Sequence, residues 1–280
     1  MLSIRYILLL CHIGDYGMVL GKEIRLNRII RKGKIVCVTL DHGVTSGPIQ
    51  GIESIQNTIS KVVNGGATAV LVHKGVIRSV TSMGNTGLIM HLSASTSLGS
   101  SQNRKMLVAN VKEAIRIGAD AVSVHVNVGG KEEPEMLEQL GTISGECNMW
   151  GFPCVAMMYP RGENVKNSHD PEKVAHAARL GAELGADIVK TVYTGDIDSF
   201  REVVKSCPVP IAIAGGPTTN NEEELLETVQ GALNAGAIGV TFGRNIFQHK
   251  DPSKMVRALS ALVIDKLTVD DALKELSSSA

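Results

Sequence analysis

The chain has 280 residues, of which 44% are hydrophobic and 20% are charged, and this composition excludes a mostly disordered protein. The formal net charge is zero, with 28 basic and 28 acidic residues, so no overall field favours nucleic acid or an anionic membrane. The five cysteines are widely spaced and form no Cys-x-x-Cys pair, which argues against a disulfide framework or a zinc cluster and indicates a reducing cytoplasm.

The N-terminal region carries a short apolar run, Ile7 to Leu10, which is far below the roughly 20 residues that a membrane span needs. The run is also shorter than the apolar region of a usual signal peptide, and no small cleavage-site residues follow it. We therefore predict a poorly ordered extension over residues 1–17 and one folded domain over residues 18–280, with helical patterning from Gly21 onward.

A junction recurs four times along the chain, in which an amphipathic stretch ends in Gly-Ala and an apolar run follows at once. The copies begin at Gly66, Gly118, Gly185 and Gly236. Glycine suits the left-handed residue just after a helix, and the small alanine lets the chain turn sharply into a buried strand. Each copy therefore predicts a helix-to-strand joint, and the spacing leaves room for one more strand between successive copies.

Short apolar runs typical of a parallel sheet buried on both faces occupy those intervals. They cover residues 34–40, 88–92, 154–158 and 211–214. Helices are predicted over residues 49–64, 106–117, 135–149, 171–184, 199–205, 221–235 and 252–267, whereas residues 74–86 show little helical period. Eight strand–helix units in about 250 residues predict a single closed (β/α)8 TIM barrel. An open doubly wound sheet is the alternative.

In a TIM barrel the chemistry lies at the C-terminal ends of the strands. That rule selects Asp41, His42, His73, Lys74, His91, His125, Tyr159, Arg161, Lys190, Gly215, Gly216, Gly243 and Arg244.

Lys190 ends the apolar run that begins at Ala186 and is expected to point into or just above the barrel interior. Burial and a neighbouring cation such as Arg161 would disfavour its ammonium form and leave an amine able to form a Schiff base. A lysine that caps a turn, or binds phosphate as a permanent cation, fits the same position. Position alone does not decide between these roles.

Two further side chains are candidates for proton transfer. Asp41 would face Lys190 across the barrel mouth, although Asp-His-Gly after a strand also fits a simple turn. Tyr159 ends the fifth strand and could donate or accept a proton, although tyrosines also pack at barrel rims. Among the histidines His42 is the best candidate, whereas His91 and His125 are expected to be structural.

Two glycine-rich loops follow the seventh and eighth strands, at Gly215-Gly216-Pro217 and at Gly243-Arg244-Asn245. Barrels commonly build a phosphate site in these two positions from backbone N–H groups and a helix N-terminus. Gly-Gly-Pro alone is only a turn signal. The two loops together predict a phosphate site.

These segments, taken in order with Leu40-Asp41-His42-Gly43, Tyr159-Pro160-Arg161-Gly162 and Asp187-Ile188-Val189-Lys190-Thr191, resemble the archaeal-type class I aldolase family from about Gly21 to Leu276. The resemblance implies that Lys190 is the Schiff-base lysine, Tyr159 the proton donor and Asp41 the proton acceptor. It also implies substrate-binding roles for His42, Gly43, Val44, Thr45, Pro160, Arg161, Gly215, Gly216, Gly243 and Arg244.

The family has two relevant branches, the fructose-bisphosphate aldolases and the transaldolases that make 2-amino-3,7-dideoxy-D-threo-hept-6-ulosonate for aromatic amino acids. An aromatic residue tends to stand two positions before the tyrosine in the first branch, and Met157 stands there in this chain. This difference and the run His125-Val126-Asn127-Val128-Gly129 favour the second branch. A phosphosugar-binding barrel without Schiff-base chemistry is a further alternative.

The resemblance implies a three-carbon transfer from 6-deoxy-5-ketofructose 1-phosphate to L-aspartate semialdehyde. A phosphorylated keto-sugar and an aldehyde are then the partners, with no nucleic acid and no membrane. An iminium serves as the electron sink, so neither a metal nor an organic cofactor is expected. The resemblance also implies a homo-oligomer, in the form of a ring-like decamer.

Overall fold

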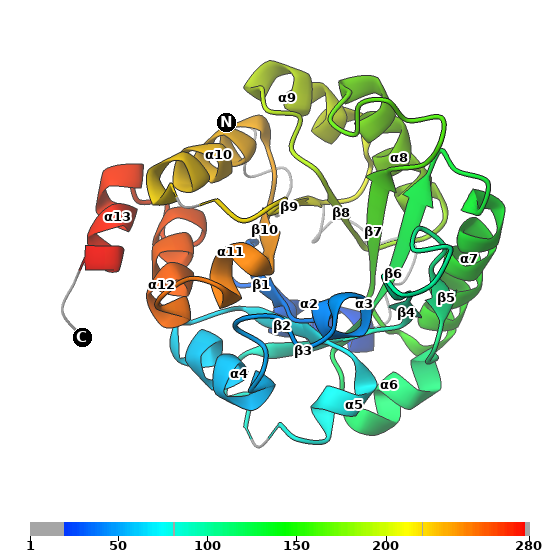
Figure 1. Cartoon of the computed structure of the whole chain (residues 1–280), viewed down its shortest axis with the longest axis horizontal. Helices are drawn as coiled ribbons and strands as arrows, with labels where there is room; N and C mark the ends of the chain where they lie inside the picture. The colour runs from blue at the N-terminus through cyan, green and yellow to red at the C-terminus, as the bar shows by residue number, and fades with distance from the viewer. Residues whose placement is uncertain (1–19, 81, 220, 278–280) are drawn as a thin grey trace.

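Eight short apolar segments pair in parallel and close into a barrel in the computed structural model, which describes residues 20–80, 82–219 and 221–277 (Figure 1). The order around the barrel is β1-β10-β9-β8-β7-β6-β3-β2. The strands are β1 Ile35–Thr39, β2 Ala69–Val72, β3 Gly87–His91, β6 Ala121–Val128, β7 Cys154–Pro160, β8 Ile188–Thr191, β9 Ile211–Ala214 and β10 Gly239–Phe242. The predicted TIM barrel is confirmed, and the open sheet is excluded.

Helices surround the barrel and cover the outer faces of the strands (Figure 1). The longer ones are α4 Ile55–Asn64, α6 Val111–Ile117, α7 Glu133–Trp150, α8 Pro171–Glu183, α9 Ile197–Ser206, α10 Glu222–Ala235, α12 Pro252–Val263 and α13 Val269–Ser277. Short helices α3 His42–Ser46, α5 Lys74–Ile77 and α11 Arg244–Phe247 follow β1, β2 and β10 directly. Among the described helices, none is both long enough and apolar enough to cross a membrane.

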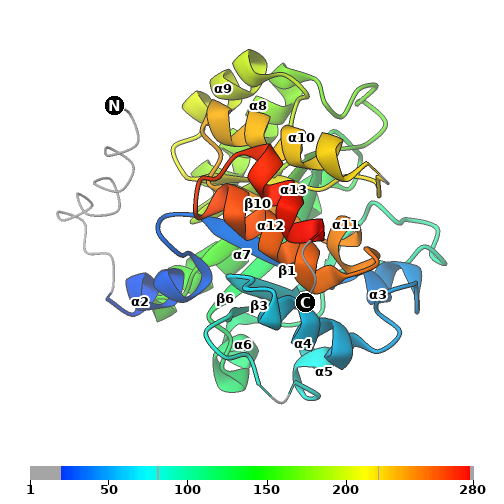
Figure 2. The same cartoon turned by 90° about the vertical axis from the view of Figure 1, so that its left-hand side faces the viewer.

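Alternation along each strand produces two apolar layers. On β1, for example, Val36 and Val38 belong to the layer between strands and helices, whereas Ile35 and Cys37 belong to the barrel interior. The interior layer also contains Leu26 and Ile29 of α2 Leu20–Ile29. Helix α2 lies at the opposite end of the barrel from α3 and α11 (Figure 2). It therefore closes the end away from the predicted site.

The four Gly-Ala junctions adopt the predicted backbone conformation. Their glycines have φ values of +90° at Gly66, +88° at Gly118, +94° at Gly185 and +112° at Gly236. These angles lie in the left-handed region, where a side chain is disfavoured. Strands β2, β6, β8 and β10 each begin three residues after these glycines, so each repeat is the helix-to-strand joint that the sequence predicts.

The predicted helix over residues 106–117 is wrong in its first part. Met106–Leu107 forms strand β5, which pairs antiparallel with β4 Ser93–Ala94. Helix α6 begins only at Val111, because the side chain of Asn110 accepts a hydrogen bond from the backbone N–H of Glu113 and caps the helix. The hairpin formed by β4, β5 and the loop over residues 95–105 was not predicted.

Other helix boundaries also differ from the predictions. Helix α4 begins at Ile55 rather than at residue 49, because residue 51 is a glycine with φ +90° packed directly against the backbone of Phe247. Helix α12 ends at Val263, and a separate helix α13 follows it. The described residues between 74 and 86 contain one short helix, α5. The predicted extension over residues 1–17 lies outside the described residues.

Candidate active site

A cavity of about 770 Å³ opens at the C-terminal ends of the strands. This volume is typical of a small-molecule site. Side chains from β1, β3, β6, β7, β8 and β10 line it, together with residues of the β4–β5 hairpin and of the loops that follow β1, β7, β9 and β10. Its lining includes four Lys or Arg side chains and a single acidic one, Asp41. The cavity thus concentrates positive charge in a chain whose net charge is zero.

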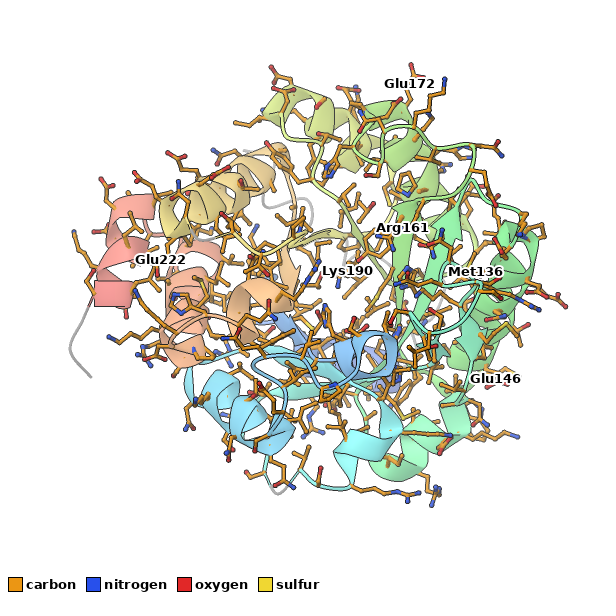
Figure 3. All side chains as sticks on the ribbon, in the orientation of Figure 1. Met136, Glu146, Arg161, Glu172, Lys190 and Glu222 are labelled. Carbon is orange, nitrogen blue, oxygen red and sulfur yellow. The ribbon has the colours of Figure 1, made fainter. Side chains whose placement is uncertain are left out.

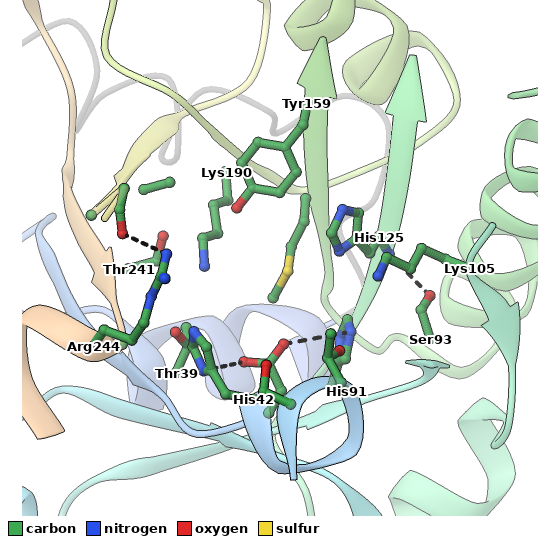
Figure 4. A pocket seen from close by; sticks show the side chains of 18 of the residues that line it. Thr39, His42, His91, Ser93, Lys105, His125, Tyr159, Lys190, Thr241 and Arg244 are labelled. Carbon is green, nitrogen blue, oxygen red and sulfur yellow. Dashed lines mark hydrogen bonds and ion pairs between the residues drawn. The ribbon is translucent and has the colours of Figure 1, made fainter. Parts of the chain in front are cut away.

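Lys190 lies at the centre of the barrel mouth on β8 (Figure 3). The residue is only 6% exposed, and its strand neighbours in register are Met157 on β7 and Ala212 on β9. Its side chain points into the cavity (Figure 4). Within the described part of the chain, its Nζ has no ion-pair partner. A buried lysine in this position is the arrangement that amine catalysis needs.

Asp41 follows β1 and occupies the position before α3. Its Oδ1 lies 3.6 Å from His42 Nδ1 and its Oδ2 lies 3.8 Å from His91 Nε2. Burial by itself would raise the pKa of Asp41, but attraction to His91, His42 and Lys190 outweighs burial and holds this pKa well below its usual range. An ionised Asp41 is thus available as a proton acceptor near Lys190.

The histidines around Asp41 are held as neutral rings. Burial lowers the pKa of His91 to about 3 despite the nearby Asp41, and it also lowers the pKa of His42 and of His73. His91 Nδ1 lies 2.6 Å from Ser123 Oγ, and its ring packs against that of His73 at 5.1 Å between centroids. His91 also lines the cavity, and its structural role stays a prediction.

Tyr159 lies on β7 with its side chain in the cavity and its phenol oxygen directed toward Lys190 (Figure 4). Its ring packs edge-on against His125 at 5.0 Å between centroids, and the Arg161 guanidinium lies 5.4 Å from its centroid. The sequence predicts His125 just after the end of its strand, but it lies within β6. It nevertheless lines the cavity. The three predicted catalytic residues Lys190, Tyr159 and Asp41 therefore share one cavity.

The glycine loops after β9 and β10 form one wall of this cavity. A side chain at Gly243 would place its Cβ 2.3 Å from His42 Cε1, so only glycine allows this close approach. Arg244 Nη2 donates to the carbonyl oxygen of Gly216 at 3.0 Å. Buried Asn245 donates to the carbonyl oxygens of Gly215 at 2.7 Å and Pro217 at 3.2 Å. These bonds fix the two loops against each other.

Seven of the predicted substrate-binding residues line the cavity: His42, Thr45, Arg161, Gly215, Gly216, Gly243 and Arg244. Gly43, Val44 and Pro160 do not line it. Gly43 and Val44 are exposed on α3, and Pro160 is buried within β7. Their roles remain predictions. Lys74, also selected at a strand end, turns away and pairs with Glu113 at 3.2 Å.

Sequence reasoning missed Lys105, which lines the cavity from the β4–β5 hairpin and is only 7% exposed. A single lysine in a polar stretch carries no recognisable signal, and the predicted helix begins only after it, at residue 106. Among the described residues, no group of His, Cys, Asp and Glu has the geometry of a metal site.

Comparison with known proteins decides the family. A family model described as DeoC/LacD family aldolase matches residues 35–249. The chain belongs to the DeoC/LacD family of aldolases. This aldolase is 42% identical over 254 residues to the 2-amino-3,7-dideoxy-D-threo-hept-6-ulosonate synthase of Halobacterium salinarum, covering 90% of this chain and 95% of the relative.

Two more relatives bear on the chemistry of this DeoC/LacD aldolase. The 2-amino-4,5-dihydroxy-6-oxo-7-(phosphonooxy)heptanoate synthase of Streptomyces griseus is 39% identical, covering 87% of this chain and 90% of the relative. A solved structure of a Schiff-base-forming fructose-1,6-bisphosphate aldolase has a TM-score of 0.81 at 35% identity, covering 87% of this chain and 99% of that one. The predicted class I aldolase family is confirmed.

Proposed function

We propose that this aldolase is a 2-amino-3,7-dideoxy-D-threo-hept-6-ulosonate synthase, a transaldolase that moves a three-carbon fragment from 6-deoxy-5-ketofructose 1-phosphate to L-aspartate semialdehyde. The observation that carries the proposal is the buried Lys190 in one cavity with the phenol of Tyr159 and the ionised carboxylate of Asp41. The 42% identity to the Halobacterium salinarum enzyme supports this choice of substrates.

The first half of the reaction cleaves the donor. The Lys190 amine attacks the ketone carbon beside the methyl group, and loss of water gives an iminium. The carbon–carbon bond next to the adjacent hydroxyl-bearing carbon then breaks, and its electron pair moves into the iminium to give an enamine. A phosphate-bearing three-carbon aldehyde leaves. Tyr159 and Asp41 move the protons of these steps, Asp41 as the acceptor and Tyr159 as the donor.

The second half joins the fragment to the acceptor. The enamine carbon attacks the aldehyde carbon of L-aspartate semialdehyde, and a proton from Tyr159 neutralises the new alkoxide. Water hydrolyses the resulting iminium, which releases the seven-carbon product and restores the Lys190 amine. Atoms and electrons balance without an oxidant or reductant.

Arg244 and the bare backbone of Gly215, Gly216 and Gly243 are the residues to which we assign the donor's phosphate. Backbone N–H groups in a glycine turn and a guanidinium are groups that bind phosphate well. Asn245 keeps this wall in place through its bonds to the carbonyl oxygens of Gly215 and Pro217.

Borohydride reduction tests the proposal. Incubation with the phosphorylated donor followed by reduction should leave a stable adduct on Lys190, detected by peptide mass spectrometry. Addition of L-aspartate semialdehyde before reduction should discharge the adduct and form the seven-carbon amino acid. An enzyme that gives no adduct would contradict Schiff-base chemistry, and one that ignores the semialdehyde would contradict the transaldolase assignment.

A second candidate function is that of a class I fructose-bisphosphate aldolase. The structural similarity at a TM-score of 0.81 favours it, and cations on more than one wall of the cavity suit a substrate with two phosphates. Met157, which lines the cavity beside Lys190, favours the transaldolase instead. Rapid cleavage of fructose 1,6-bisphosphate without any effect of aspartate semialdehyde would establish this second candidate.

The proposal also includes a cellular compartment and an oligomeric state. Four described cysteines are free and buried, which suits a reducing cytoplasm. The family resemblance suggests a homo-oligomer, and a ring-like decamer is its expected form. Light scattering coupled to size exclusion would measure the mass of the assembly, and a monomeric mass would contradict this part of the proposal.

A further inference from the structure

Lys105 is a buried cation that the steps above do not use. It is 7% exposed, and its Nζ donates a hydrogen bond to Ser95 Oγ. Within the described residues no carboxylate lies within ion-pair distance of this Nζ, and only Asp41 attracts it, from farther away. Burial and repulsion by Arg161 lower the pKa of Lys105 to about 8. Because a buried ammonium without a direct counter-ion is costly, its retention inside a substrate cavity points to an anion that arrives with the substrate.

The hairpin that carries Lys105 is fixed to the barrel. The side chain of buried Asn127 donates to the backbone carbonyl oxygen of Asn103 at 2.7 Å. On the same strand, the backbone N–H of His125 donates to Ser93 Oγ at 3.0 Å, and the His125 ring lies 3.0 Å from Asn127 Oδ1. The run from His125 to Asn127 therefore holds the hairpin in place over β6. Lys105 is positioned rather than free to swing into solvent.

Lys105 and Arg244 lie on different sides of Lys190. Arg244 follows β10, whereas the hairpin of Lys105 is fixed to β6, and β6 and β10 are four positions apart in the ring of eight strands. Figure 4 shows Lys190 between Arg244 on one side and Lys105 on the other. The cavity therefore offers a cation on each side of the proposed Schiff base.

We propose that Lys105 binds the carboxylate of the incoming acceptor aldehyde, which makes it a specificity-determining residue of the second half-reaction. This inference rests on the proposed function, since it requires an acceptor with a carboxylate. The released aldehyde and the acceptor both present a carbonyl to the same reacting carbon. They differ in their anionic groups, so a cation separate from the phosphate loops can favour the carboxylated aldehyde. Arg244 and the glycine loops are assigned to the phosphate, so the charge of Lys105 on the other side of Lys190 remains for a second anionic group.

The test compares Lys105→Met with wild type in the two half-reactions. Methionine keeps the length of the stem and removes the charge. We expect the KM for L-aspartate semialdehyde to rise roughly ten- to a hundredfold, as the loss of a hydrogen bond to a charged group predicts. We expect the donor concentration that gives half-maximal borohydride trapping to change less than threefold. With propanal, an acceptor without a carboxylate, variant and wild type should behave alike.

Two further variants separate this role from a structural one. Lys105→Arg keeps the charge and should recover much of the affinity for the acceptor. Arg104→Met removes the neighbouring cation of the same hairpin, which pairs with Glu135 outside the cavity, and should leave the acceptor KM within threefold of wild type.

Several results would overturn the inference. An acceptor KM in Lys105→Met within twofold of wild type would do so. An equal rise in the donor requirement, or an equal effect of Arg104→Met, would contradict it as well. A wild-type enzyme that traps the donor but never consumes the semialdehyde would instead contradict the proposed function, and the inference would fall with it.

Discussion

Met157 and Lys190 are register partners on the adjacent strands β7 and β8, and both line the cavity. The thioether of Met157 therefore borders the position of the amine that we assign to covalent chemistry. Tyr159 stands two residues after Met157 on the same face of β7, because side chains of a strand alternate between its faces. An apolar neighbour at the level of Lys190 and a phenol two residues further along β7 give Lys190 a partly dry environment with one proton donor.

Lys190→Met is expected to abolish turnover and borohydride trapping while leaving the fold intact. The new side chain keeps the stem volume in a position that is 6% exposed, and it removes the amine. Steady-state assays and thermal unfolding would test both parts. Activity above about a hundredth of wild type would contradict covalent catalysis by Lys190.

Arg244→Ala is expected to raise the KM for the phosphorylated donor roughly ten- to a hundredfold with a much smaller effect on kcat. The guanidinium is remote from the bonds that break, so its loss weakens binding rather than chemistry. Arg244 also donates a hydrogen bond to the carbonyl oxygen of Gly216. Arg244→Lys is therefore the matched control, because it keeps the positive charge and removes the guanidinium that makes this bond. An unchanged KM with a collapsed kcat would place Arg244 in the chemical steps.

The catalytic constellation could be predicted from sequence because each member follows or ends a buried apolar run. Such runs fix the strands, and in a closed parallel barrel the ends of all strands converge on one mouth. Lys190, Tyr159 and Asp41 are brought together by this rule alone, although they are far apart in the chain. The Gly-Ala joints also predict where four of the strands begin, because their glycines adopt the left-handed backbone angles that end a helix.

The hairpin and Lys105 could not be predicted in the same way. Strands β4 and β5 have two residues each, too few to show alternation. The inward position of Lys105 depends on bonds from His125 to Ser93 and from Asn127 to Asn103, which join residues 32 and 24 positions apart. Nothing local in the sequence encodes such contacts.

The KM for L-aspartate semialdehyde is expected to be constant below pH 8 and to rise above it. Lys105, whose pKa is lowered to about 8, carries its charge below that pH and loses it above, so carboxylate binding weakens as pH increases. Asp41, His91, His125 and Arg161 also influence Lys105 or lie near it. Burial lowers the pKa of both histidines, so they are neutral in this pH range, and Asp41 stays ionised. None of these three groups therefore changes its protonation state in this range.

Lys105→Arg is the control for this pH profile, because a guanidinium remains charged well above pH 8. Its acceptor KM should stay level across the range in which the wild-type value rises. An identical rise in the variant would assign the titration to the substrate or to another group.

Tyr159→Phe is expected to separate Schiff-base formation from carbon–carbon chemistry. Phenylalanine keeps the ring that packs against His125 and removes the proton of the phenol that points toward Lys190 (Figure 4). Loss of a positioned proton donor typically costs on the order of 10²- to 10⁴-fold in rate. Formation of the iminium needs the Lys190 amine and a different proton-transfer group, which we assign to Asp41.

The variant should therefore still be trapped on Lys190 by borohydride with donor while it makes almost no seven-carbon product. Single-turnover assays with trapping at intervals would measure both quantities in one sample. Near-normal turnover would leave Tyr159 with a packing role against His125 and Arg161. The proton donor would then have to be sought around Asp41 and His42, whose side chains lie 3.6 Å apart.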